Sequence, residues 1–140
     1  MSFISFHQVA LFSFTSPNDS TSQGALTKLT THTGYTHALY LATRGDFIVV
    51  GDMIKSFSLL IYKHDEKKFE EIAKDYNSNW LTAVETIDDE EFIGGDASGH
   101  VITVRTNNDA PDEEDRARLE EEGGIHFGDM VNKFKHGMFF

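Results

Sequence analysis

The stretch Phe47-Ile48-Val49-Val50-Gly51-Asp52 returns, one residue shorter, as Phe92-Ile93-Gly94-Gly95-Asp96. The copies are 44 to 45 residues apart, and each lies between apolar runs. A period of about 40–45 residues made of four short strands is typical of a β-propeller blade, a small sheet buried by its neighbours. The repeat therefore favours a propeller over two unrelated hairpins in a small sandwich. The glycine before the aspartate fits a turn that needs positive φ or close backbone approach.

Short apolar runs separated by turn residues surround the repeat and predict strands. These runs are Ala38–Ala42, Phe47–Val50, Phe57–Tyr62, Trp80–Ile87, Glu91–Gly94 and Val101–Val104. Residues 1–14 also have the aromatic, alternating character of a strand, and they lack the positive start and cleavage pattern of a signal peptide. The Ser/Thr/Gly-rich residues 17–37 predict a loop with at most one short strand.

The length sets a limit on this architecture. The 140 residues hold about three blades, whereas closed propellers have about 4–8. We therefore expect an all-β partial propeller, as in a segment of a longer chain, with a diverged or wrongly joined segment at 1–37 and a partial C-terminal propeller at 38–140. One element breaks the pattern: residues 112–122 are rich in helix formers between Pro111 and Gly123, and they predict a short surface helix inserted between strands.

Composition and motifs argue against catalysis, metal binding, and binding to nucleic acids or anionic membranes. The net charge of −11 is unfavourable for nonspecific nucleic-acid binding and for docking on anionic membranes. The absence of cysteine excludes thiolate nucleophiles and cysteine-based zinc sites. None of the seven histidines is in a two-ligand spacing such as HxH or HExxH, and no phosphate-binding loop or nucleophile elbow occurs. We therefore expect no enzyme activity, no metal site and no cofactor.

A binding surface is the better candidate. Asp75-Tyr76-Asn77-Ser78-Asn79-Trp80 places two aromatic residues among turn formers, and exposed aromatics are the usual anchors of protein interfaces. The alternative is that Trp80 begins the next strand and packs inward. Leu39-Tyr40, at an inner-strand position near a propeller rim, has the same ambiguity, and the pattern alone leaves both open.

Three stretches carry a specific family resemblance: ALYL with RGDFIVVGDMIKSFSLLIYK (within 38–63), FEEIAKDYNSNWLTAVETIDDEEFIG (69–94) and DEEDRARLEEEGGIHFGDMVNKFKHG (112–137). Residues 38–140 resemble the family of the damage-specific DNA-binding protein large subunit, an adaptor of cullin-4–RING ubiquitin ligases. Its superfamily includes the large subunits of a cleavage/polyadenylation factor and of a splicing factor. The resemblance implies three seven-bladed, WD40-like propellers, of which this chain would supply blades of the third.

The resemblance also implies partners and site residues. In that family the first and third propellers hold substrate receptors and the second binds the cullin, so this chain would bind receptors, with the cullin bound by other regions and damaged DNA reached through a receptor. The receptor-contact positions fall on Leu39, Tyr40, Lys74, Asn77 and Trp80. Lys74 replaces the usual arginine and loses its bidentate geometry. Ser78 replaces a turn proline, and residues 1–36 do not follow the family.

These observations predict a non-catalytic scaffold linked to DNA repair and protein ubiquitination, located in the nucleus and cytoplasm. The alternative from another class is a subunit of an RNA-processing factor with nucleic-acid contacts, which the net charge disfavours. A third is a diverged, truncated paralogue that folds poorly because its blade edges are unpaired.

Overall fold

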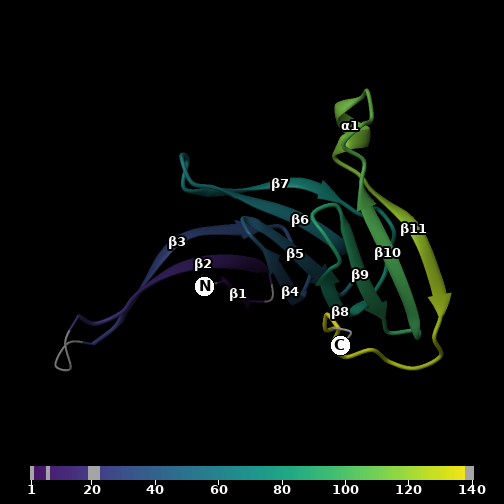
Figure 1. The fold of residues 1–140 in the computed structure, drawn as a ribbon, viewed down its shortest axis with the longest axis horizontal. Coiled ribbons are helices and arrows are strands. Elements are labelled where there is room, and N and C mark those ends of the chain that lie inside the picture. The colour runs from purple at the N-terminus through teal and green to yellow at the C-terminus, as the bar shows by residue number, and fades with distance from the viewer. Residues whose placement is uncertain (1, 6, 19–22, 138–140) are drawn as a thin grey trace.

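The computed structural model describes residues 2–5, 7–18 and 23–137, which form three antiparallel sheets and one short helix (Figure 1). In the order in which the strands pair, the sheets are β1 (Ser2–Ser5), β2 (Gln8–Thr15) and β3 (Ala25–Thr33); β4 (Ala38–Arg44), β5 (Phe47–Asp52), β6 (Ser56–Lys63) and β7 (Lys68–Lys74); and β8 (Leu81–Thr86), β9 (Glu91–Asp96), β10 (His100–Thr106) and β11 (Leu119–His126). Each sheet pairs only strands that follow one another in the chain, which confirms the expected partial propeller.

Two apolar layers join the three sheets. Between the first and second sheets lie Val9, Val50 and Leu60, with Tyr35 from the β3–β4 connection. A second set of buried side chains lies between the second and third sheets and includes Phe57, Leu59, Leu81 and Phe92. The innermost strands β4 and β8 contact each other, and so do the outer strands β3 and β7. Neighbouring sheets therefore bury their facing sides against each other, as the repeat predicts.

The glycine before each repeated aspartate serves close packing. A Cβ on Gly51 would lie 2.8 Å from Val84 Cγ1 of the third sheet. A Cβ on Gly95, its counterpart before Asp96, would lie 2.9 Å from Cβ of Val131 in the segment after β11. Neither glycine has a positive φ. Of the two reasons that the sequence left open, close approach is the one that applies.

The repeated aspartates close the turns that follow them. Asp52 Oδ1 accepts hydrogen bonds from the backbone N–H groups of Ile54 (2.8 Å) and Lys55 (2.9 Å). Asp96 Oδ1 accepts them from Ser98 and His100, both at 2.9 Å. The same side chain thus performs the same task one repeat later, which supports the equivalence of the two sheets.

The inserted helix is present but shorter than predicted. Helix α1 spans Glu113–Arg116, has no buried residue and projects from the sheets (Figure 1). Residues 119–122, expected to be helical, instead begin β11. Leu119 is buried in the core opposite Thr106, and the backbone N–H of Lys74 bonds to the carbonyl of Ala117. Burial of Leu119 and the pairing of β11 with β10 outweigh the helix propensity of the glutamates at 120–122.

The N-terminal part has more strand than the sequence suggested. The strand character of residues 1–14 is confirmed by β1 and β2, but the expected loop at 17–37 contains the nine-residue strand β3. Strands β2 and β3 pair over their full length as a long hairpin with a bulge after Leu11. The division of the chain into 1–37 and 38–140 stays a prediction.

Candidate protein-binding surface

The connection from β7 to β8, residues 75–80, is pinned by a buried aspartate. Asp75 accepts hydrogen bonds from the Ser56 hydroxyl (2.7 Å) and the Asn77 backbone N–H (3.0 Å). Its own N–H donates to the carbonyl of Phe57. Asn79 adds a hydrogen bond to Ser56. A connection without regular secondary structure is thereby held against the end of β6.

This pinned connection presents aromatic side chains to solvent. Tyr76 is 57% exposed and Trp80 is 53% exposed, whereas most large apolar side chains of the second and third sheets are buried. The carbonyl of Trp80 accepts a hydrogen bond from the N–H of Ala97, which fixes the backbone beside it. Trp80 therefore lies on the surface just before β8. Rigid, exposed aromatic side chains lose little entropy on binding and make effective anchors.

Lys74 and Asn77 lie beside these aromatics. The Lys74 ammonium lies 5.1 Å from the centre of the Tyr76 ring, and the Arg118 guanidinium lies 5.3 Å from it, so two cations face one aromatic ring. Lys74 and Asn77 are both exposed, and both line the same cleft. This arrangement places two cations and an aromatic ring at one edge, where Glu114 and Asp115 line a hollow together with Tyr76 and Arg118.

Leu39 and Tyr40, both half-buried in β4, are placed differently. Tyr40 packs against the core between the second and third sheets. It also lines a separate hollow of about 220 Å³ that includes Lys133 and Phe134. The structure thus brings together Lys74 and Asn77 in one cleft, while Tyr40 lies in another hollow and Leu39 and Trp80 line neither.

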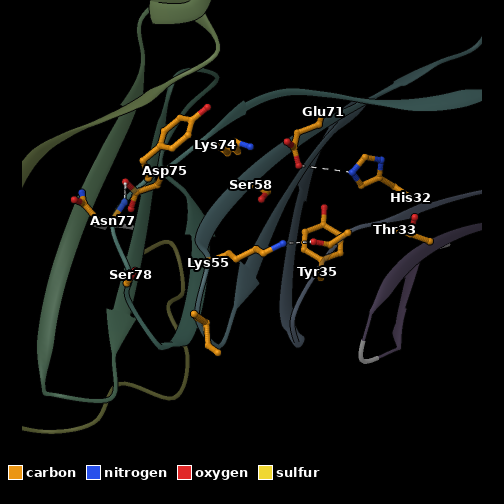
Figure 2. Close-up of a pocket in the computed structure, with 13 residues that line it drawn as sticks. His32, Thr33, Tyr35, Lys55, Ser58, Glu71, Lys74, Asp75, Asn77 and Ser78 are labelled. Carbon is orange, nitrogen blue, oxygen red and sulfur yellow. Dashed lines mark hydrogen bonds and ion pairs between the residues drawn. The ribbon is translucent and has the colours of Figure 1, made fainter.

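Lys74 and Asn77 share a cleft of about 430 Å³. Figure 2 shows the residues that line it. Residues that the sequence did not single out form its other walls: His32, Tyr35, Ile54, Lys55, Ser58 and Glu71. His32 of β3 faces Glu71 of β7 across the cleft at 3.6 Å. These residues come from separate elements of the first two sheets, and no pattern in the sequence pointed to them, because only the stacking of those sheets brings them together.

Tyr35 is the most unusual group in this cleft. It is only 6% exposed, and its hydroxyl has no hydrogen-bond partner among the described residues. Burial raises the pKa of Tyr35 above its ordinary value, and the carboxylates of Glu71 and Asp52 raise it further. The hydroxyl therefore remains a protonated donor at every physiological pH.

Asp52 fixes the backbone of two connections beside the cleft. Its Oδ2 accepts the N–H groups of Thr36 (2.9 Å) and His37 (3.0 Å) from the β3–β4 connection, while its Oδ1 closes the β5–β6 turn. Burial opposes ionisation of this carboxyl, but the four backbone donors outweigh it and lower the pKa of Asp52 below its ordinary value. One ionised side chain thus fixes two of the connections that border the cleft.

Within the described residues, no helix is long and apolar enough to cross a membrane.

The polar groups that line the cleft include the Tyr35 hydroxyl, which can donate a hydrogen bond, and the ion-pairing side chains His32 and Glu71. That arrangement is suited to recognising a partner.

Comparison with known proteins shows the family to which this chain belongs. Residues 18–140 match the model of the CPSF A subunit region. The expectation that residues 1–36 do not follow the family is therefore wrong for residues 18–36, which lie within the match. The chain is 55% identical over 106 residues to DNA damage-binding protein 1 of Oryza sativa subsp. japonica, and 53% identical over 106 residues to DNA damage-binding protein 1b of Arabidopsis thaliana; each match covers 76% of this chain and 10% of the relative. It is 46% identical over 130 residues to DNA damage-binding protein 1 of Solanum lycopersicum, covering 93% of this chain and 12% of the relative.

The chain spans about a tenth of the length of these relatives. The matched region includes every stretch on which the sequence resemblance rests, from β4 to the residues after β11. The match to the family model over 123 of 140 residues, together with the repeated sheets, shows that the chain belongs to the family of the CPSF A subunit region.

Proposed function

We propose that this chain is a receptor-docking segment of a non-catalytic adaptor of cullin-4–RING ubiquitin ligases, linked to DNA repair and present in nucleus and cytoplasm. The observation that carries the proposal is the pinned connection 75–80 with its exposed Tyr76 and Trp80. The relatives' name, DNA damage-binding protein 1, supports the link to DNA damage.

The docking surface would consist of Leu39, Tyr40, Lys74, Asn77 and Trp80. Trp80 supplies exposed aromatic area, Lys74 a flexible positive charge, and Asn77 an amide at the rim of the cleft. Lysine makes a single-point contact where arginine would make a bidentate one, so we expect Lys74 to contribute less than the aromatic residues. Binding of the cullin would require other regions of a longer protein.

A chimaera tests the proposal with the protein in its working context. The matching region of the rice relative is replaced by residues 38–137 of this chain, and affinity for a purified cullin-4 substrate receptor is measured by surface plasmon resonance. We expect Trp80→Ala to weaken binding at least tenfold, since an anchor residue contributes about 2 kcal/mol or more. Thr43→Ala, an exposed change in β4, is the matched control and should leave affinity unchanged. Equal affinity of the two variants would remove Trp80 from the interface.

RNA binding is the alternative function, as the resemblance to the large subunits of a cleavage/polyadenylation factor and of a splicing factor implies. The net charge of −11 opposes it, because phosphate contacts require clustered lysine and arginine. Titration of the chain with single-stranded RNA at low salt separates the two: the adaptor proposal expects no binding, and salt-sensitive binding would favour the alternative.

A further inference from the structure

The structure pairs two histidines that lie far apart in the sequence. His100 at the start of β10 and His126 at the end of β11 are directly opposite each other in the strand ladder. Their ring centres are 4.9 Å apart. Both residues are exposed, and both line a hollow that also contains Asp96 and Glu121. The sequence could not reveal this pair, because only the strand pairing brings the two residues together.

Their backbone positions are fixed from both sides. The carbonyl of Gly99 accepts hydrogen bonds from the N–H groups of Phe127 (2.8 Å) and Gly128 (2.9 Å), which ties the residue before His100 to the residues after His126. On the other side, Asp96 Oδ1 accepts the N–H of His100 at 2.9 Å. The two imidazoles are thus held on a rigid frame.

Asp96 also sets the orientation of one ring. Its carboxylate oxygens lie 3.2 and 3.3 Å from Nδ1 of His100. When Nδ1 carries the proton and donates to this carboxylate, Nε2 is the nitrogen that keeps a lone pair for a metal ion. A histidine whose second nitrogen is bound to a carboxylate is the usual arrangement of a histidine metal ligand.

The spacing of the rings fits chelation. With a metal–nitrogen distance of about 2.0–2.1 Å, an imidazole centre lies about 3.2 Å from the metal. Two imidazoles at an angle of about 90–109° at the metal then have centres roughly 4.5–5.2 Å apart. The separation of 4.9 Å lies in this interval.

We infer that His100 and His126 form a two-histidine chelate for a divalent transition-metal ion of the zinc type, with Asp96 orienting His100. Among the described residues no group of three or more His, Cys, Asp or Glu side chains is close enough to enclose a metal. The remaining coordination positions are therefore filled by water or by a partner's side chain, and the hollow that they face includes Asn79, next to Trp80.

Zinc titration of the chain labelled with nitrogen-15 tests the inference, because ring nitrogen resonances report each histidine separately. We expect the His100 and His126 resonances to shift together and to saturate at one equivalent of zinc chloride. His100→Gln and His126→Gln should each lower the zinc affinity at least tenfold, because either change leaves a single ligand. His64→Gln is the matched control: His64 also contacts a carboxylate, Asp46 at 2.8 Å, but its ring neighbour is Tyr62.

Three results would overturn the inference: no shift of the His100 and His126 resonances up to millimolar zinc, earlier saturation of other histidines, or parent-like affinity of both glutamine variants. Circular dichroism of each variant checks that the fold is retained. We expect it to be, since both rings are on the surface.

Discussion

Replacement of Gly94 by alanine tests how the second and third sheets pack. The added Cβ would overlap the ring of Phe57, which is fully buried. Overpacking of this kind costs roughly 1–3 kcal/mol. Alanine regains about 0.5–1 kcal/mol over glycine in a strand. We therefore expect Gly94→Ala to lower the free energy of unfolding by up to about 2.5 kcal/mol, with a central value of about 1 kcal/mol.

Gly123→Ala is the matched control. Gly123 also lies in a strand, β11, but its added Cβ would meet only Thr103 Oγ1 at an ordinary 3.6 Å. This variant should be unchanged or more stable by up to about 1 kcal/mol. With a slope of about 2 kcal/mol per molar urea, the unfolding midpoints of the two variants should differ by about 1 M.

A double variant identifies the contact responsible. In a chain that already carries Phe57→Leu, the ring that the added methyl group overlaps is absent. Gly94→Ala should therefore lower the free energy of unfolding by at least about 0.5 kcal/mol less than it does in the parent. The reasoning would be refuted if Gly94→Ala were no more destabilising than Gly123→Ala, or if its cost were the same in both backgrounds.

Two further changes probe the surface and its support. In the isolated chain Trp80→Ala should change the thermal midpoint little, because Trp80 is half exposed, so a large decrease would assign it a structural role. Asp52→Asn should cost about 1–3 kcal/mol at pH 7, since an amide replaces a carboxylate that accepts four N–H groups. Because the pKa of Asp52 is lowered in the fold, its contribution is complete above the unfolded-state pKa of about 3.9 and is lost as the pH falls below it. Urea unfolding from pH 7 to pH 3 should therefore show a smaller loss of stability in Asp52→Asn than in the parent, and equal losses would contradict this assignment.

The sequence predicted the elements in which pattern and propensity agree. Strands β4, β5, β6, β8, β9 and β10 all coincide with apolar runs, and the aspartate of each repeat closes a turn as its glycine-aspartate pair suggested. Strand β7 was missed because Lys68–Lys74 is mostly charged and its bulge breaks the alternation of buried and exposed positions. Strand β11 was missed because only Leu119 is buried, so nothing but the ladder with β10 reveals it.

The candidate surface was predicted in part for the same physical reasons. The aromatic residues among turn formers at 75–80 marked a candidate surface, but the pattern alone left open whether Trp80 is exposed or packs inward. In the structure Tyr76 and Trp80 are both more than half exposed. The cleft next to them was not predicted, since Tyr35, Lys55 and Glu71 belong to three elements that only the stacking of the first two sheets brings together. The histidine pair of β10 and β11 depends in the same way on strand register.

The central claim is that receptors dock on the connection 75–80 and its neighbours. Hydrogen–deuterium exchange of the chimaera, with and without a purified cullin-4 substrate receptor, tests it most directly. The account predicts that the receptor slows exchange in peptides covering residues 38–41 and 74–80, with little change in the hairpin of β2 and β3. Protection confined to other strands, or receptor binding with no protection at 74–80, would contradict it.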